Sequence, residues 1–398
     1  MSEGAGPLSG LTVIDLGQIY NAPYATLLLA YGGARVIKVE PRNGENLRSR
    51  GRVAGAGAPF AMLNSNKETV TLNLKHQEGK KLLERLTERA DVLVQNFRPG
   101  VMESLGLSAE KLMATNPRLI FASGSGYGST GPYRDFAAMD ITIQAMSGAM
   151  SITGFPDREP VKAGPAIGDF LGGIHLYGAI VTALYERERT GIGTKVEVAM
   201  LDAIYPSMMS SLGLYFGSTN DVPSRTGNRH SGLAEAPYNV YSASDGYVAL
   251  ICVTDRHWRS LLDVMGRDDL LNREDLAARV GRVAHIDEVD QIVTSWMSSL
   301  TKQNAVDSLT AGDVPCAPVR ELAEVVRDPH LHQRRMLVDI VHPEFGPLTV
   351  PHSPIRVGDY HAPVVPSRSL GQDNRTVFRD WLGLTDEEID DLLEREVI

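Results

Sequence analysis

Cysteine is scarce in this chain of 398 residues, which contains only Cys252 and Cys316. Two cysteines form neither a disulfide framework nor a metal-ligand pattern, so we expect a reducing, cytoplasmic environment and no metal site. Positive charge is also in deficit, because the formal net charge is -10. An acidic chain argues against nucleic acid as a partner, although it leaves room for a local basic site that binds a phosphorylated small molecule.

Long apolar runs and targeting signals are absent as well. No apolar run approaches the roughly 18 residues that span a membrane, and residues 1–7 lack the basic and apolar regions of a signal peptide. The sequence therefore predicts no membrane partner. Its composition, 43% hydrophobic and 22% charged, is that of an ordinary globular protein, and its length suits two domains or one large domain with an insertion.

The common catalytic motifs are missing too. The chain has no Gly-x-x-x-x-Gly-Lys-Ser/Thr phosphate loop, no His-Glu-x-x-His zinc helix and no Gly-x-Ser-x-Gly elbow. Residues 124–128 (GSGYG) follow a predicted strand, but they lack the third glycine that a dinucleotide loop needs at its fixed spacing. These absences disfavour a serine α/β-hydrolase and a nicotinamide-dependent enzyme.

Alternating strands and helices are what the N-terminal half does contain. Their order predicts an α/β fold with a mainly parallel, doubly wound sheet. Ligands bind such sheets beyond the carboxyl ends of the strands, so the loops after Leu16, Glu40, Gln95 and Ser123 are the candidate positions. The predicted strands are residues 11–16, 34–40, 69–73, 91–95 and 119–123, and the predicted helices are 22–31 and 77–90.

The pattern changes after residue 216. Residues 217–237 are rich in Ser, Thr, Asn, Gly and Arg, which is typical of a linker or a mobile loop. A second segment of mixed strands and helices follows, and the chain ends in an acidic amphipathic helix that Thr385 is expected to cap. The elements predicted in this half are strands at 247–253 and 348–350 and helices near 257–265, 289–300, 304–311 and 385–396.

Asp169 is the strongest single candidate for chemistry. It lies in the sequence Gly164 to Phe170 (GPAIGDF), directly before an apolar run with helical spacing. At a helix start the dipole and free amides would keep the carboxylate ionised, and such a carboxylate can attack an activated acyl group. The alternative is that Asp169 serves only as the N-cap of the helix, since aspartate is a preferred residue there.

An ordered series of segments resembles the class III CoA-transferase family, of the formyl-CoA and carnitine CoA-transferase kind. The match runs from Leu8 to the C-terminus. Each segment is short, but their number and order make the resemblance specific. The segments are residues 33–41 (GARVIKVEP), 63–67 (LNSNK), 94–100 (VQNFRPG), 126–133 (GYGSTGPY), 168–169 (GD), 190–193 (TGIG) and 314–319 (VPCAPV).

The resemblance implies a fold and an assembly. We expect a Rossmann-like large domain built from both chain ends, an inserted smaller α+β domain, and an interlocked-ring homodimer. The implied boundaries are 1–216 for the first part of the large domain, 217–226 for a linker, 227–320 for the small domain and 321–398 for the return segment.

The resemblance also implies a site. The nucleophilic aspartate of the family falls on Asp169, and no permanent cofactor is expected, because a coenzyme A thioester is the substrate. The CoA-contacting positions fall on Tyr20, Arg42, Leu72, Lys75, Asn96, Phe97, Arg98 and Asp140. Arginine and lysine in loops at strand ends suit the phosphates of CoA, and Arg48 belongs to this basic set as well, whereas the ring of Phe97 offers an apolar face. A solvated surface charge is the alternative for each basic residue.

Three positions depart from the family pattern. Ser104 and Ala137 stand where several relatives carry a basic residue, so these two CoA contacts are in doubt. In place of the long glycine-rich lid of the formyl-CoA enzymes the chain has residues 226–232 (TGNRHSG), which argues against oxalate–formate exchange. We expect Gly227, Asn228, Arg229 and His230 to form an acceptor or lid loop, with Arg229 and His230 pairing with a second carboxylate.

The resulting prediction is a CoA-transferase that moves CoA from an acyl-CoA donor to a short-chain or dicarboxylic acid, such as succinate, through covalent aspartyl intermediates. An α-methylacyl-CoA racemase on the same fold is the alternative. A racemase needs a titratable acid/base pair, and Met139 stands where its histidine would be. A non-catalytic CoA-binding protein and a lyase or hydrolase of the same fold are further alternatives.

Overall fold

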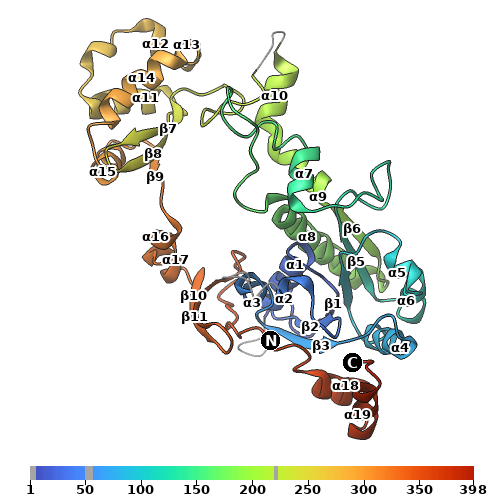
Figure 1. The fold of residues 1–398 in the computed structure, drawn as a ribbon. Coiled ribbons are helices and arrows are strands. Elements are labelled where there is room, and N and C mark those ends of the chain that lie inside the picture. The colour runs from blue at the N-terminus through green and yellow to red at the C-terminus, as the bar shows by residue number, and fades with distance from the viewer. Residues whose placement is uncertain (1–5, 50–56, 219–222) are drawn as a thin grey trace. The chain divides into compact units, whose positions relative to one another are not determined.

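The computed structural model describes residues 6–49, 57–218 and 223–398 (Figure 1). Their contacts divide the chain into two compact units. The first unit contains the chain up to Ile143, Pro165–Ile204 and Asp328–Ile398, and the second contains Gln144–Gly164 and Tyr205–Arg327. The domain boundaries predicted from the sequence stay predictions about the assembled protein.

The first unit is built on a six-stranded sheet in which every pair of neighbouring strands is parallel. This finding confirms the predicted α/β class and the parallel sheet. The strand order is β3-β2-β1-β4-β5-β6, so the direction of winding reverses between β1 and β4. The strands are β1 (Thr12–Asp15), β2 (Arg35–Glu40), β3 (Lys67–Thr71), β4 (Val92–Gln95), β5 (Ile120–Ser125) and β6 (Lys195–Ala199).

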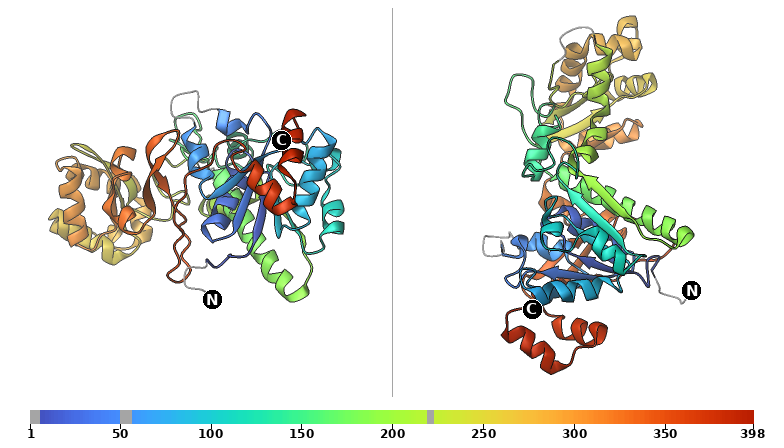
Figure 2. Two further views of the ribbon diagram at one scale, coloured as in Figure 1. Left: turned by 90° about the horizontal axis from the view of Figure 1, so that it is seen from below. Right: turned by 90° about the vertical axis from the view of Figure 1, so that its right-hand side faces the viewer.

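Helices cover both faces of this sheet, because successive side chains of its strands point to opposite faces (Figure 2). Ile14 belongs to one hydrophobic core, together with residues of α4 and α18, whereas its neighbour Val13 belongs to a second core with α1 and α8. The helices of this part are α1 (Asn21–Tyr31), α2 (Asn46–Ser49), α3 (Ala58–Leu63), α4 (Gln77–Thr87), α5 (Val101–Ser104), α6 (Ala109–Thr115), α8 (Ile167–Thr190) and α9 (Met200–Ile204), together with the first residues of α7 (Asp140–Met146), whose last residues belong to the second unit.

Helix α8 lies against α1 at very close range. A Cβ atom added to Gly172 would lie 2.2 Å from Nδ2 of Asn21, and one added to Gly173 would lie 2.6 Å from the carbonyl oxygen of Asn21. Only glycine permits this approach at the N-terminal end of α8. By length and composition α8 is also apolar enough to cross a membrane, which corrects the expectation that the chain has no such run. One such helix is weak evidence for a membrane, because core helices pass the same test.

The C-terminal part of the chain returns to the first unit and covers the sheet edge at β3. The backbone amides of Thr69 and Thr71 donate to the side chains of Asp373 and Asn374, each at 2.8 Å. Helix α18 lies beside β3 and α4, and α19 lies against α18 (Figures 1 and 2). The elements are α17 (Pro329–Gln333), an antiparallel hairpin of β10 (Leu337–His342) and β11 (Gly346–Pro351), α18 (Asn374–Leu382) and α19 (Asp386–Glu394), which Thr385 caps as predicted.

The second unit contains an antiparallel three-stranded sheet of β7 (Tyr238–Ala243), β8 (Gly246–Ile251) and β9 (Cys316–Pro318). Its core surrounds the buried side chain of Trp258. Helix α10 is different, because none of its residues is buried. The helical elements are η2 (Tyr205–Met208), α10 (Met209–Gly217), α11 (Asp255–Met265), η3 (Asp268–Leu270), α12 (Glu274–Ala277), α13 (Arg279–Ala284), α14 (Ile286–Met297), α15 (Lys302–Ala311) and α16 (Leu322–Val325).

Candidate active site

The loops after β1 and β4 meet where the winding of the sheet reverses, which is where ligands bind in folds of this kind. Asn96, directly after β4, joins them by two hydrogen bonds. Its Oδ1 accepts from the backbone amide of Gln18 at 2.8 Å, and its Nδ2 donates to the carbonyl oxygen of Gln18 at 2.9 Å. The side chain of Asn96 is therefore occupied in holding the loop that follows β1.

This β1–α1 loop has a strained backbone. Ile19 has a φ of 64°, a left-handed value that is costly for a β-branched residue. Buried side chains hold Ile19 itself and Gly17, two residues before it. Lys38 donates to the carbonyl oxygen of Gly17 at 2.7 Å, and Oε2 of Glu45 accepts from the amide of Ile19 at 3.3 Å. Strain kept in place by so many partners is characteristic of functional sites.

Two networks of buried polar side chains support the β1–α1 loop. In the first, Lys67 donates to Asp15, Pro23, Thr26 and Asn64 at 2.8–3.0 Å. Burial lowers the pKa of Lys67 to about 8 although the charge of Asp15 opposes this shift. Burial would raise the pKa of Asp15, but the charges of Lys67 and Lys38 hold it below its usual value. The lysines in two of the segments that carry the family resemblance are therefore structural.

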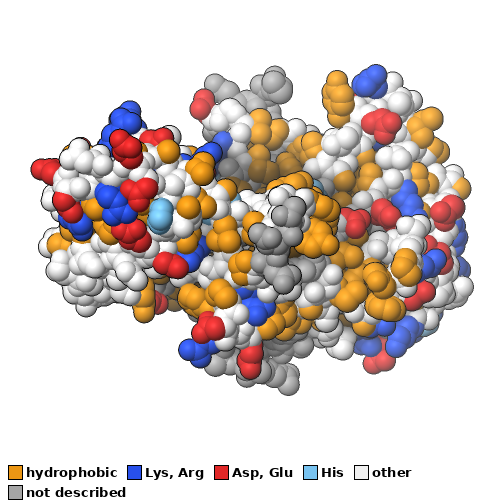
Figure 3. Space-filling model, turned by 90° about the horizontal axis from the view of Figure 1, so that it is seen from above, with side chains coloured by type: hydrophobic (Ala, Val, Ile, Leu, Met, Phe, Trp, Pro, Cys, Tyr) orange, Lys and Arg blue, Asp and Glu red, His pale blue; other side chains and the backbone are white. Residues whose placement is uncertain are grey.

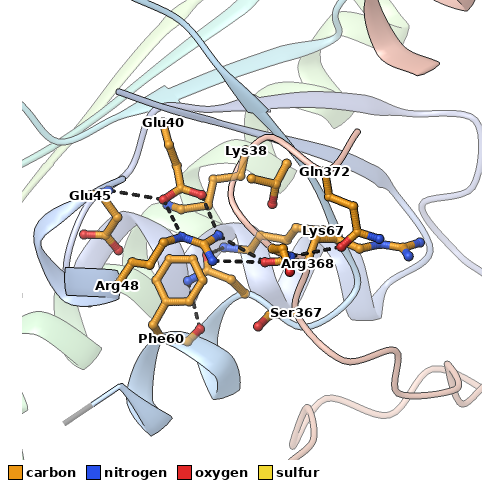
Figure 4. A network of polar contacts seen from close by, with 12 residues as sticks. Lys38, Glu40, Glu45, Arg48, Phe60, Lys67, Ser367, Arg368 and Gln372 are labelled. Carbon is orange, nitrogen blue, oxygen red and sulfur yellow. Dashed lines mark hydrogen bonds and ion pairs between the residues drawn. The ribbon is translucent and has the colours of Figure 1, made fainter. Parts of the chain in front are cut away.

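The second network, drawn in Figure 4, corrects the role expected for Arg48. Its guanidinium donates to both carboxylate oxygens of Glu40, at 2.7 and 3.0 Å, and to the carbonyl oxygen of Arg368 at 3.1 Å. It also lies 4.0 Å from the centre of the Phe60 ring. Arg48 is thus bound on several sides by the protein itself, and it holds the 41–49 segment in place instead of offering a charge to phosphate.

Asp169 is the third residue of α8, not its N-cap, which is Ala166. Asp140 performs the capping instead, because its Oδ1 accepts from the amides of Gly168 at 2.8 Å and of Asp169 at 3.3 Å. Among the described residues, none donates a hydrogen bond to the carboxylate of Asp169. The purely structural interpretation of Asp169 as a cap is therefore wrong.

Asp169 is buried, with only 8% of the residue exposed. Burial, and then the nearby charge of Asp140, raise its pKa from 3.8 to about 7. The expectation that the helix start favours the ionised form of this group needs correction, because its pKa is raised and not lowered. The amides that would have stabilised its negative charge are taken by Asp140.

Asp169 lines a pocket of about 360 Å³, which we call the Asp169 pocket. A second pocket of about 500 Å³, the Arg42 pocket, lies at the ends of β1, β2 and β3, and the two share Gln18, Phe97 and Val101. The Asp169 pocket is lined by Gln18, Ile19, Asn21, Asn46, residues 96–99, Val101, residues 124–127, Arg134, Phe136, Ala138, Met139, Asp169 and Met200.

The structure brings most of the predicted CoA-contacting residues to these two pockets. Arg42, Leu72, Lys75 and Phe97 line the Arg42 pocket, and Asn96, Phe97 and Arg98 line the Asp169 pocket. The role of each in binding CoA stays a prediction. Arg42 has an ion pair with Glu396 at 3.2 Å.

Four predicted positions lie outside both pocket linings. Tyr20 precedes α1 and stacks on Phe170 with ring centres 6.1 Å apart, and Asp140 accepts hydrogen bonds from the α8 amides of Gly168 and Asp169. Ser104 and Ala137, the two doubtful positions, are exposed.

The predicted acceptor loop belongs to the second unit. Arg229 donates to Asp287 at 2.6 Å and to Asp290 at 2.8 Å, both on α14. The ring of His230 lies against Tyr238, with centres 5.3 Å apart, and its Nδ1 accepts from the amide of Gly232. The charge of Arg229 is therefore matched within its own unit, and the selection of an acceptor by Gly227, Asn228, Arg229 and His230 stays a prediction.

Several residues of the Asp169 pocket were not singled out by the sequence analysis, among them Gln18, Asn21 and Arg134. Gln18 lies in the loop after β1, which the sequence analysis names as a candidate position without naming Gln18 itself. Asn21 and Arg134 gave no comparable signal, because their places depend on the packing of α1 against α8 and on the fold of residues 127–139. No group of three or more His, Cys, Asp or Glu side chains that could hold a metal ion occurs within residues 6–49, 57–218 and 223–398.

Comparison with known proteins agrees with this geometry. The model of CoA-transferase family III matches residues 8–374. This chain belongs to CoA-transferase family III. It is 36% identical to the formyl-CoA:oxalate CoA-transferase of Streptomyces avermitilis, over 96% of this chain and 97% of that one. It is 36% identical to the succinate–glutarate CoA-transferase of Agrobacterium fabrum, over 84% of this chain and 85% of the relative.

A solved structure supports the same assignment. The crystal structure of a CAIB/BAIF family protein from Brucella suis superposes with a TM-score of 0.83 at 32% identity, covering 95% of this chain and all of that one. The predicted enzyme class, a CoA-transferase, is confirmed.

Proposed function

We propose that this CoA-transferase moves CoA from an acyl-CoA donor to a short-chain or dicarboxylic acid, such as succinate, through covalent intermediates on Asp169. The observation that carries the proposal is the carboxyl group of Asp169, which is buried in a pocket and relieved of the capping role by Asp140. The pocket shares three lining residues with the larger Arg42 pocket, whose cationic side chains suit the phosphates of CoA. Oxalate in the name of one relative, and succinate and glutarate in that of another, support the dicarboxylate class.

In the proposed reaction the ionised carboxylate of Asp169 attacks the thioester carbonyl of the donor. The C–S bond breaks, which leaves an aspartyl–acyl anhydride and CoA thiolate. The thiolate attacks the aspartyl carbonyl, releases the donor acid as its carboxylate and forms an aspartyl-CoA thioester. The acceptor carboxylate attacks this thioester to give a new anhydride, and the freed thiolate then attacks the acceptor's acyl carbon. Every step conserves charge and atoms, so the free energy of the thioester is retained without ATP.

The residues around Asp169 suit this sequence of steps. Its raised pKa shows that the pocket disfavours a bare negative charge, and forming the anhydride removes that charge. The hydrogen bond from Asn21 Nδ2 to the carbonyl oxygen of Asp169, at 3.3 Å, helps to fix the first turn of α8. Met139 lines the pocket with a thioether that cannot exchange protons, so the racemase alternative gains no support.

We further propose an interlocked homodimer located in the cytoplasm. Helix α10 of the second unit supports association of some kind, because Tyr215 and Phe216 are 69% and 76% exposed. Hydrophobic side chains also lie open among the charged ones on the face drawn in Figure 3. Sedimentation at nanomolar concentration tests this proposal, since threaded rings cannot separate on dilution. A monomer at that concentration would contradict the interlocked dimer.

Trapping of the intermediate tests the mechanism. The protein is incubated with succinyl-CoA and hydroxylamine, and peptides containing residue 169 are examined by mass spectrometry. An aspartyl hydroxamate at residue 169 is the expected product, and it should be absent from the Asp169→Asn variant, which retains the backbone contacts with Asp140. Transfer of CoA between acids without any trapped adduct at residue 169 would overturn the covalent mechanism.

A further inference from the structure

Part of the lining of the Asp169 pocket comes from residues 127–139, and neither the resemblance nor the proposed mechanism gives a role to Arg134 in this stretch. Tyr127, Arg134, Phe136, Ala138 and Met139 all line the pocket. Glycine makes this close packing possible, since a Cβ atom on Gly126 would lie 2.1 Å from the Cβ of Ala138.

Arg134 lies in a turn whose backbone is well held. The amide of Phe136 donates to the carbonyl oxygen of Tyr133 at 2.9 Å, and the amide of Arg134 donates to Gly131 at 3.4 Å. The rings of Tyr127, Tyr133 and Phe136 contact one another, with centres 5.2 to 6.1 Å apart. The ring contacts therefore link residues on both sides of Arg134 and support the turn that carries it.

Two cationic side chains line the Asp169 pocket, Arg98 and Arg134. Among the described residues, the only ion pair of Arg134 is with its neighbour Asp135, at 3.3 Å, and the two side chains are 48% and 78% exposed. Such an exposed pair contributes little free energy, so it does not compete strongly with a ligand. Arg229 is the opposite case, because Asp287 and Asp290 already hold its guanidinium.

We propose that Arg134 binds the carboxylate of the acid substrate that does not react, and so makes the enzyme selective for dicarboxylic acids. This inference rests on the proposed function. The reacting carboxyl group must reach Asp169, and its negative charge is lost when the anhydride forms. The second carboxylate keeps its charge throughout the reaction and needs a cationic partner in the same pocket, and the planar guanidinium suits it by two parallel hydrogen bonds.

Arg98 is the less suitable partner for this carboxylate. It lies between Phe97 and Val101, which both also line the Arg42 pocket, where the phosphates of CoA are expected to bind. Arg134 instead shares its part of the chain with Phe136 and Met139, whose apolar side chains suit the methylene groups of an acid such as succinate. Both arginines also line a neighbouring pocket of about 320 Å³ over β5 and β6.

The test compares two acceptors of equal chain length, succinate and butyrate, with one acyl-CoA donor. In Arg134→Ala we expect kcat/KM for succinate to fall at least about tenfold, because a charge-assisted hydrogen bond is lost, while that for butyrate changes less than about threefold. Arg134→Lys should restore part of the preference for succinate, since lysine keeps the positive charge but cannot donate the two parallel hydrogen bonds of a guanidinium. Arg189→Ala, at an exposed position near the end of α8, is the surface control and should leave both acceptors unchanged.

Each other outcome has a definite meaning. An equal fall for both acceptors would assign Arg134 to CoA binding or to folding, and no fall for succinate would remove it from the site, so either result overturns the inference. A selective loss in Arg229→Ala but not in Arg134→Ala would make the 227–232 loop the selector. These results presuppose a wild-type enzyme that transfers CoA. If the wild type transfers CoA to no acid and gives no hydroxamate at residue 169, the proposed function itself has failed.

Discussion

Two buried aspartates of the same unit, Asp15 and Asp169, have opposite surroundings. Asp15 is fully buried, accepts hydrogen bonds from Gly17, Thr26 and Lys67, and keeps its pKa below the usual value because the charges of Lys67 and Lys38 outweigh the effect of burial. Asp169 is 8% exposed, and burial together with Asp140 raises its pKa to about 7. A buried carboxylate with partners stabilises a loop, whereas one without partners is a reactive group whose burial costs free energy.

The largest difference is expected in catalysis. Asp169→Asn should reduce CoA transfer below about one-thousandth of the wild-type rate, because removal of a covalent nucleophile removes the whole pathway. Its free energy of unfolding at pH 8 should be equal to or higher than that of the wild type, since a poorly solvated negative charge is lost. Steady-state kinetics and urea unfolding measure the two quantities. Substantial residual CoA transfer, or a marked loss of stability, would mean that Asp169 has a structural role like that of Asp15.

Changes to the buried ion pair of Lys67 and Asp15 should instead lower the stability of the protein. Lys67→Met removes the ion-pair partner of Asp15, and we expect a loss of about 3–5 kcal/mol in the free energy of unfolding, because the buried carboxylate then has no ion pair although the charge of Lys38 remains nearby. The double variant Lys67→Met/Asp15→Leu should recover part of this loss, since neither charge is then buried. Urea unfolding followed by circular dichroism checks both. If the single variant is as stable as the wild type, the pair does not support the β1–α1 loop as described.

The raised pKa of Asp169 predicts a specific pH dependence. Between pH 3.8 and about 7 the unfolded carboxyl loses its proton while the folded one retains it, so its contribution to stability is present below pH 3.8 and is lost as the pH rises to about 7. The stability of the wild type relative to Asp169→Asn should therefore fall across this range. Single-turnover acylation should rise with pH and level off above about 7, because the nucleophile must be ionised. A flat profile in both measurements would contradict the raised pKa.

The smallest effects are expected at Asp140. Asp140→Ala removes the cap of α8 and should cost about 0.5–2 kcal/mol of stability. Asp140→Asn retains an oxygen acceptor for the amides of Gly168 and Asp169 but removes the charge, so it should shift the pH midpoint of acylation to a lower value at little cost in stability. Calorimetry and the pH–rate profile separate the two variants. An unchanged midpoint in Asp140→Asn would leave burial as the only cause of the raised pKa.

The sequence predicted what depends on local pattern. The alternation of strands and helices predicted the parallel sheet, and the rule that ligands bind beyond strand ends led to the loops that now line both pockets. It did not predict the partners of individual charges. The carboxylate of Asp140 caps a helix that begins 27 residues later, and Arg48 is held by Glu40 together with a carbonyl group 320 residues away. Such pairings decide the pKa of Asp169 and the availability of Arg48, and they exist only after the chain has folded.

The contact of Asp373 and Asn374 with the edge of β3 has a consequence for how the protein is made. The first strands of the sheet leave the ribosome early, but the groups that accept hydrogen bonds from Thr69 and Thr71 lie 304 and 303 residues further along the chain. Until they are synthesised, the open edge of β3 offers unpaired backbone groups to any other extended segment. Nascent chains halted before residue 373 should therefore depend strongly on chaperones.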